Sequence, residues 1–169
     1  MTQTVVITGF MGCGKSKAAR ALAKNLDVSF VDLDDVITAR TGRTPAQLIN
    51  EDGERAFRAI ETETLRDVLQ SHAAGVIALG GGAWIEAANR ELIELHSCAS
   101  VWLDVPFEVC WSRIESAGED RPLGKTRDQA LARYERRRPV YQLANIHLAV
   151  LGHEDLEDLI SRVKSLLSA

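Results

Sequence analysis

The chain has 169 residues, of which 46% are hydrophobic and 26% charged, a composition typical of one globular domain with room for a real core. The net charge of −4, with acidic and basic residues interspersed, argues against a nucleic-acid or anionic-membrane surface and favours a small-molecule partner. No apolar run approaches the ~18 residues that span a bilayer, no signal peptide is recognisable, and the three cysteines lack metal-ligand spacing, so we expect a cytoplasmic protein with reduced thiols.

The first predicted strand, residues 5–8, leads into a phosphate-binding motif. The next residues read Gly9-Phe10-Met11-Gly12-Cys13-Gly14-Lys15-Ser16, which fits G-x-x-x-x-G-K-[ST]. Glycines let successive backbone N–H groups turn inward around phosphate oxygens. Lys15 would reach the β- and γ-phosphates, and Ser16 would open a helix and ligate Mg²⁺. We therefore predict a nucleotide site that includes Gly12, Cys13, Gly14, Lys15, Ser16 and Lys17.

Acidic residues follow the second predicted strand, residues 29–31. Asp32 and Asp34 are expected on one side of the chain, because alternate strand residues share a side. One carboxylate would help to hold hydrated Mg²⁺, and the other would accept a proton from an alcohol nucleophile. The alternative is that Asp34 or Asp35 caps a helix that begins near residue 36, and for Asp35 we favour the cap.

Residues 44–72 are predicted to be helical, with Thr44 as the cap and Pro45 in the first turn. Gly53 is expected to divide this stretch into two helices. Arg58 lies among apolar neighbours in the second of them. A helical arginine is usually solvated or ion-paired, but its planar fork also suits a substrate carboxylate.

A run of three glycines ends the third predicted strand, residues 76–79. Gly80, Gly81 and Gly82 would weaken a strand, which makes sense where a ligand or another backbone passes within contact distance. The alternative is an ordinary turn from strand to helix. We favour contact with a ligand.

The second half of the chain continues the alternation of strands and helices. A strand at 100–103 precedes a helix at 106–116, a polar loop at 116–125, a helix at 127–141, a strand at 146–150 and a C-terminal helix. Strands alternating with helices predict an α/β fold with three layers, in which a mostly parallel sheet is covered on both faces. The loop carries Arg121 and resembles a mobile lid that closes over the nucleotide, although an ordinary surface loop fits too. We draw no boundary within residues 1–169.

Taken together, these motifs resemble the shikimate kinase family. The resemblance rests on the phosphate loop and on five further motifs: Asp32-x-Asp34, Phe57-Arg58-x-Ile60-Glu61, Gly80-Gly81-Gly82-Ala83, Arg121-Pro122-Leu123 and Arg137-x-Pro139-Val140-Tyr141. It implies the nucleoside-monophosphate-kinase-like fold of P-loop proteins, with five parallel strands and a lid. It also implies Mg²⁺-dependent transfer of phosphate from ATP to the 3-hydroxyl of shikimate, in aromatic amino-acid biosynthesis.

The resemblance also implies a role for each matching residue. Lys15, Asp34 and Arg121 would be catalytic, with Asp34 as the base and Arg121 at the phosphates. Ser16 and Asp32 would be associated with magnesium. The substrate would contact Asp34, Arg58, Gly80, Gly81, Gly82 and Arg137, where the two arginines hold its carboxylate.

Four departures from the family pattern surround the nucleotide. Lys17 replaces a usual threonine, and Arg113, the candidate for stacking on adenine, lies one residue further from Arg121 than expected. Gly124 follows the lid motif where leucine is usual, and Leu151-Gly152-His153 replaces a polar turn. Two other functions remain open: a gluconate kinase-like enzyme, and a catalytically idle nucleotide-binding module that regulates a partner. We expect a monomer that binds small molecules only.

Overall fold

The computed structural model describes residues 3–118 and 126–168, and its centre is one five-stranded parallel sheet. The strand order is β2-β3-β1-β4-β5. The strands are β1 (Val5–Thr8), β2 (Phe30–Asp32), β3 (Val76–Ala78), β4 (Ala99–Asp104) and β5 (Ile146–Ala149). The expected α/β architecture with a parallel sheet is confirmed.

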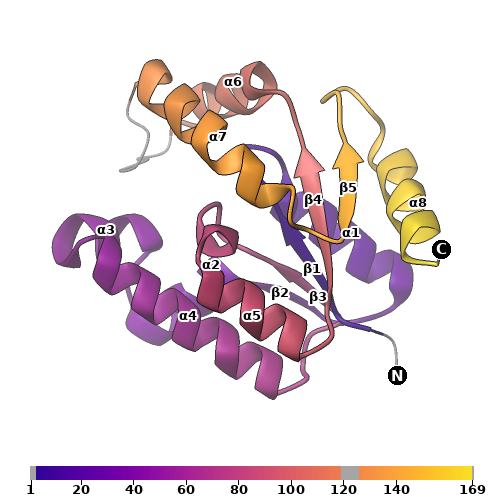
Figure 1. Cartoon of the computed structure of the whole chain (residues 1–169), viewed down its shortest axis with the longest axis horizontal. Coiled ribbons are helices and arrows are strands. Elements are labelled where there is room, and N and C mark those ends of the chain that lie inside the picture. The colour runs from indigo at the N-terminus through magenta and orange to yellow at the C-terminus, as the bar shows by residue number, and fades with distance from the viewer. Residues whose placement is uncertain (1–2, 119–125, 169) are drawn as a thin grey trace.

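Helices cover both faces of the sheet, as Figure 1 shows. On one face lie α1 (Lys15–Leu26) and α8 (Leu156–Leu167), and on the other α4 (Glu54–Gln70) and α5 (Ala87–Leu95). Because both faces are covered, the central strands are continuous apolar runs; Val5, Val6 and Ile7 are at most 3% exposed. The alternation of strands and helices predicted a helix between the third and fourth strands, but neither the bounds of α5 nor the 3-10 turn Ala83–Ile85 before it.

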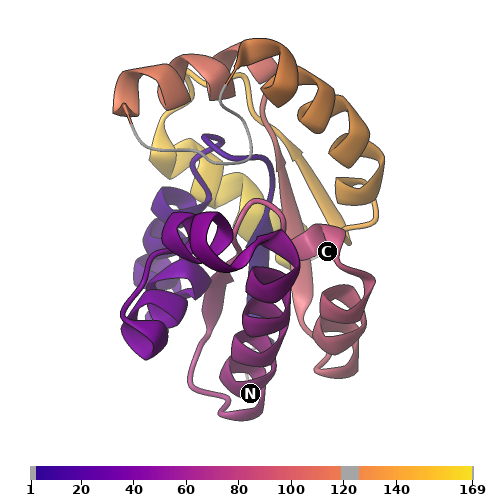
Figure 2. The same ribbon diagram turned by 90° about the vertical axis from the view of Figure 1, so that its left-hand side faces the viewer.

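Two further helices, α6 (Phe107–Ala117) and α7 (Arg127–Tyr141), lie beyond the carboxyl ends of β4 and β5 (Figure 1). Figure 2 shows them arching over that end of the molecule. Ligands of open parallel sheets bind at the carboxyl ends of the strands. The arch therefore places α7 over the expected binding region.

The segment after β2 differs from the prediction. The strand ends at Asp32 and α2 (Leu33–Thr41) begins at once, so Asp32 and Asp34 are not alternate strand residues. Asp32 caps this helix, because its Oδ1 accepts a hydrogen bond from the Asp34 backbone N–H at 3.0 Å. The expectation that Asp35 is the cap was wrong, since Asp35 lies in the first turn. The sequence pattern failed here because the strand runs into the helix without a loop.

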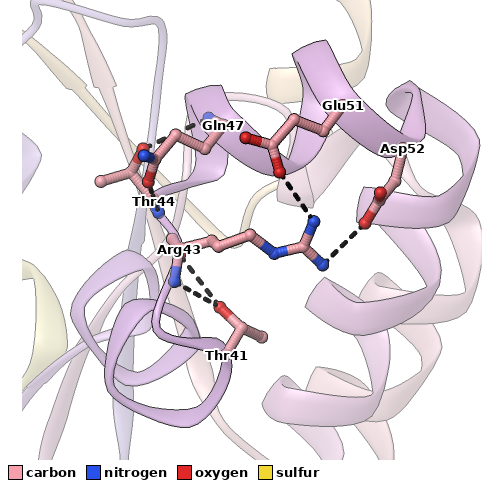
Figure 3. A network of polar contacts seen from close by, with 6 residues as sticks. All are labelled: Thr41, Arg43, Thr44, Gln47, Glu51 and Asp52. Atoms are coloured by element: carbon pink, nitrogen blue, oxygen red, sulfur yellow. Dashed lines mark hydrogen bonds and ion pairs between the residues drawn. The ribbon is translucent and has the colours of Figure 1, made fainter.

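The corner between α2 and α3 (Pro45–Asp52) is held by polar contacts (Figure 3). Thr44 and Gln47 form a capping box, in which each side chain accepts from the other's backbone N–H. Arg43 donates to Glu51 at 3.0 Å and Asp52 at 2.8 Å. Exposed ion pairs add little stability, so their effect is mainly to orient α3. Gly53, with φ of +90°, separates α3 from α4 as predicted.

The remaining sequence expectations are met in part. All three cysteines are free and buried. In α8, Leu159, Ile160 and Val163 are buried, whereas Leu166 is 44% exposed. Among the helices that the structure describes, none has the length and apolar character to cross a membrane.

Candidate active site

The phosphate loop joins β1 to α1 at the carboxyl edge of the sheet. Gly12 has φ of +76°, and a Cβ there would lie 2.6 Å from the Cys110 carbonyl oxygen, so only glycine fits. Gly14 caps α1 without a side-chain hydrogen bond, and the described first turn of this helix holds no acidic side chain. The N–H groups at this helix terminus are therefore suited to an anion such as a nucleotide phosphate.

Lys15 is buried within this loop, with 8% of the residue exposed. Its Nζ donates to the carbonyl oxygens of Gly9 and Phe10, both at 2.9 Å. The ammonium group thus lies against neutral backbone acceptors and has no carboxylate partner among the described residues. An ammonium group has three N–H donors, so Lys15 keeps one for a phosphate oxygen beside these two carbonyl contacts.

Ser16 and Asp32 lie together, where the start of α1 meets the end of β2. The Ser16 hydroxyl donates to Asp32 Oδ2 at 2.5 Å. A hydroxyl and a carboxylate are the hard oxygen donors that Mg²⁺ accepts, so these residues fit a magnesium site. No group of three or more His, Cys, Asp or Glu side chains in residues 3–118 and 126–168 could hold a metal ion.

Asp34 lies in the first turn of α2 with its carboxylate facing the glycine turn. Its Oδ1 is buried and has no hydrogen-bond partner among the described residues. Burial raises the pKa of Asp34 to about 6, and the neighbouring Asp32 charge adds to the shift. A Cβ at Gly80 would lie 2.8 Å from Oδ1, so glycine keeps this side of the carboxylate open. An enclosed carboxylate with a pKa near neutrality is suited to accept a proton.

Arg58 is held by two acids of its own helix. Its Nη1 donates to Glu61 Oε2 at 2.6 Å and its Nη2 to Glu54 Oε1 at 3.3 Å. Only 12% of the Arg58 side chain is exposed. A Cβ at Gly82 would lie 2.1 Å from Arg58 Nη2, so the guanidinium crosses the space that any larger residue would fill. In the free protein Arg58 is therefore an ion-paired helical residue, which is one of the two interpretations that the sequence allowed. Its guanidinium nevertheless lies at the glycine turn.

Glu61 is a residue to which sequence reasoning gave no role. It is fully buried, and its Oε1 has no hydrogen-bond partner among the described residues. Burial raises its pKa to about 7, although the Arg58 charge opposes the shift. The signal available in the sequence was the spacing of three residues from Arg58, which places both side chains on one helix face.

Arg137 approaches the glycine turn from α7. It is buried, with 7% of the residue exposed, and its Nη1 donates to the Gly81 carbonyl oxygen at 3.1 Å. The Tyr141 hydroxyl, one helical turn later, donates to the same oxygen at 2.5 Å. Arg58 and Arg137, which come from α4 and α7, thus meet at adjacent glycines. The role of Tyr141 as an anchor of this turn was not predicted.

Of the residues predicted to bind the nucleotide beyond residues 12–16, one contacts the phosphate loop, one is exposed on α1 and one lies outside the described residues. Arg113 Nη1 donates to the carbonyl oxygens of Gly12 at 3.3 Å and Cys13 at 3.2 Å, and its Nη2 donates to Gly152 O at 3.3 Å. Lys17 is exposed on α1. Arg121 lies outside the described residues, as does the rest of the predicted lid from residue 119 to 125.

Comparison with known proteins decides the family. A family model described as shikimate kinase matches residues 11–167. This chain belongs to the shikimate kinase family. Shikimate kinases are phosphotransferases, so the chain is an enzyme, and the alternative of an idle nucleotide-binding module is rejected.

Curated shikimate kinases resemble this chain over nearly its whole length. That of Ruegeria pomeroyi is 36% identical over 169 residues, covering 98% of this chain and 85% of the relative. That of Thermobifida fusca is 38% identical over 162 residues, covering 93% and 92%. The resemblance seen in the motifs is thus confirmed across the chain.

Solved structures of the shikimate kinase family superpose closely on this one. Shikimate kinase from Acinetobacter baumannii, solved in complex with shikimate, has a TM-score of 0.91 at 29% identity, covering 99% of this chain and 94% of that one. The enzyme from Bacteroides thetaiotaomicron has a TM-score of 0.87 at 31% identity, covering 99% of each chain. A gluconokinase from Sinorhizobium meliloti reaches only 0.62 at 17% identity, covering 99% and 92%, which shows a shared fold alone.

Proposed function

We propose that this protein transfers the γ-phosphoryl group of ATP to the 3-hydroxyl of shikimate, giving shikimate 3-phosphate and ADP. The observation that carries the proposal is the meeting of Arg58 and Arg137 at the glycine turn, beside the enclosed carboxylate of Asp34. Two guanidinium groups recognise a carboxylate, and an adjacent carboxylate recognises hydroxyl groups. A small polyol acid presents both, and family membership favours shikimate among such acids.

In this proposal the acceptor lies between α4, α7 and the glycine turn. Gly80, Gly81 and Gly82 let it approach the backbone, while Arg58 and Arg137 orient its carboxylate. Asp34 binds the reacting hydroxyl and takes its proton as the phosphoryl group is transferred. In-line geometry then requires the γ-phosphate on the opposite side of that hydroxyl, toward the phosphate loop.

The nucleotide side of the proposal uses the loop residues and the start of α1. Backbone N–H groups of Gly12, Cys13 and Gly14, with Lys15, hold the phosphates, and Lys17, Arg113 and Arg121 supply further positive charge around them. Ser16 and Asp32 hold Mg²⁺, which, when bound, neutralises charge on the phosphates. Lys15 and Arg121 stabilise the charge that develops during transfer.

The proposal extends to organisation and setting. Residues 1–169 form one kinase domain, in which 116–125 act as the lid and 34–72 as the acceptor-binding region. The enzyme acts as a monomer in the cytoplasm on small molecules, without nucleic-acid or membrane partners, in keeping with its net charge of −4. Light scattering on the protein as it elutes from a size-exclusion column measures its mass in solution and tests whether it is a monomer.

A coupled assay for ADP release tests the function. Shikimate, gluconate and nucleoside monophosphates are offered separately with Mg·ATP, and the product is located by phosphorus NMR. Of the acceptors offered, we expect only shikimate to cause ADP release, and we expect the product to carry a phosphate ester at its 3-position. Turnover with gluconate instead would reject the proposal in favour of the alternative kinase.

A further inference from the structure

Arg133 lies beside the proposed acceptor site, although no motif includes it. It precedes Arg137 by four residues on α7, and residues four apart on a helix lie on one face. The charges that act on its guanidinium are those of Arg137, Glu54, Arg136 and Arg58. Two of these belong to α4, so Arg133 lies on the side of α7 that faces α4 and the Arg58 pair.

The guanidinium of Arg133 is not paired within the described part of the protein. Its Nε is buried and has no hydrogen-bond partner there. The nearby acid Glu54 already accepts from Arg58 at 3.3 Å. Burial, followed by the charge of Arg137, lowers the pKa of Arg133. In the free protein its positive charge is therefore held unfavourably.

The balance of charge in this region leaves room for an anion. Arg58 pairs with two acids of its helix, Glu54 and Glu61. Arg137 donates to the neutral carbonyl of Gly81, and Arg133 has no acceptor among the described residues. These two guanidinium groups, one helical turn apart, thus have no carboxylate partner within residues 3–118 and 126–168. An anionic ligand stabilises cations that are partly buried and have unused donors, such as the buried Nε of Arg133.

We propose that Arg133 is a third cation of the acceptor site and that, with Arg58 and Arg137, it binds the carboxylate of the acceptor. This inference rests on the proposed function, because it takes the acceptor to be a carboxylic acid. It adds a residue outside the motifs that led to that function. It also makes Arg133 a residue at which substrate affinity is gained at the expense of stability in the free protein.

The test compares Arg133→Gln with the parent enzyme by calorimetric titration of shikimate and, separately, of Mg·ATP. We expect the shikimate Kd to rise about tenfold or more, as for loss of one charge-assisted hydrogen bond, with the Mg·ATP Kd unchanged. The melting temperature of the free variant should equal or exceed that of the parent. Arg133→Lys should retain part of the affinity, since it keeps the charge.

Arg136→Gln is the matched control, because Arg136 is an exposed arginine of the same helix. Its shikimate Kd should stay within about twofold of the parent. A second ligand, the methyl ester of shikimate, tests for the carboxylate itself. The parent should prefer the acid over the ester, and Arg133→Gln should reduce that preference about tenfold.

Three results would overturn the inference. One is an unchanged shikimate Kd in Arg133→Gln; another is an equal loss of affinity for the acid and the ester. The third is a lowered melting temperature with loss of Mg·ATP binding as well, which would make Arg133 a structural residue. If the parent itself neither binds nor phosphorylates shikimate, the proposed function fails first and this inference falls with it.

Discussion

The two ends of the candidate site hold their positive charges in different ways. At the acceptor end, Arg58 is paired with buried Glu61, and Arg137 is fixed on the glycine turn. At the nucleotide end, Lys15 and Arg113 donate to backbone carbonyl groups. The acceptor end therefore contains an arginine that is neutralised by carboxylates of its own helix. At the nucleotide end, Lys15 and Arg113 have no carboxylate partner among the described residues, so their charge is available to phosphate oxygens.

The difference has a consequence for stability. Buried carboxylates are destabilised when charged, and burial raises the pKa of Asp34 to about 6 and that of Glu61 to about 7. Because these folded pKa values lie above the unfolded ones, the folded state binds protons more tightly than the unfolded chain. The contribution of both groups to stability thus falls as pH rises from about 4 to about 7. These two carboxylates at the acceptor end therefore lower the stability of the folded protein at neutral pH.

Among the variants that test the difference between the two ends, Asp34→Asn is expected to have the largest effect on activity. We expect kcat to fall by ~10² to 10⁴, since asparagine cannot accept the proton, while Mg·ATP binding stays intact. The acidic fall in parental kcat near pH 6 should disappear. Single-turnover transfer with both ligands saturating is the measurement, with exposed Asp35→Asn as the control.

Two outcomes would change the role of Asp34. A near-normal chemical step would make it a substrate ligand only, and loss of Mg·ATP affinity would place it with Asp32 at the metal. Removing its buried charge should also stabilise the free variant at pH 7, by at most about 3 kcal/mol. Denaturant titration measures that gain.

Arg121→Ala tests whether the nucleotide end is completed by the lid. If Arg121 meets the phosphates only on closure, kcat should fall by roughly 10² to 10³ while shikimate binding to the free enzyme is retained. Steady-state rates and direct shikimate titration measure the two quantities. Equal kcat in variant and parent would leave residues 116–125 an ordinary surface loop.

Arg58→Ala and Arg137→Ala test whether these two arginines bind the carboxylate of the acceptor. Each removes a charge-assisted bond worth ~1.5 to 3 kcal/mol, so the shikimate KM should rise roughly 10- to 100-fold with little change for ATP. Arg58→Ala should also lower the melting temperature more, because it leaves Glu61 buried and unpaired. Exposed Arg55→Ala on the same helix is the control. Shikimate KM values that match the parent in both variants would remove these arginines from the site.

The smallest expected effect lies at the nucleotide end, at Glu154. Its carboxylate accepts from the backbone N–H groups of Leu151 at 2.5 Å and Gly152 at 2.7 Å, and these bonds lower its pKa. Gly152 in turn accepts from Arg113. Glu154→Gln should raise the ATP KM about two- to tenfold and leave the shikimate KM unchanged. The control is Glu157→Gln, on the exposed side of α8; an ATP KM equal to the parent's would contradict the prediction.

The sequence by itself determined those features that neighbouring residues specify. The phosphate loop, the cap at Thr44 and the break at Gly53 each depend on local backbone geometry, and all were predicted at their positions. The alternation of apolar runs with helical segments was sufficient for the parallel sheet. The candidate residues on these elements could be named because each lies in a contiguous motif.

Only the tertiary structure decided how those residues meet. Arg137 and Gly81 are 56 residues apart, and their contact exists because α7 crosses the carboxyl edge of the sheet. The burial of Glu61 likewise depends on which distant segments close over it, and so does that of Arg133 Nε, which has no partner among the described residues. Hydrogen bonds in a turn are set by a few dihedral angles, whereas desolvation and charge pairing depend on everything that packs around a group. That is why the sequence predicted the parts of the site, and the fold decided their charges and partners.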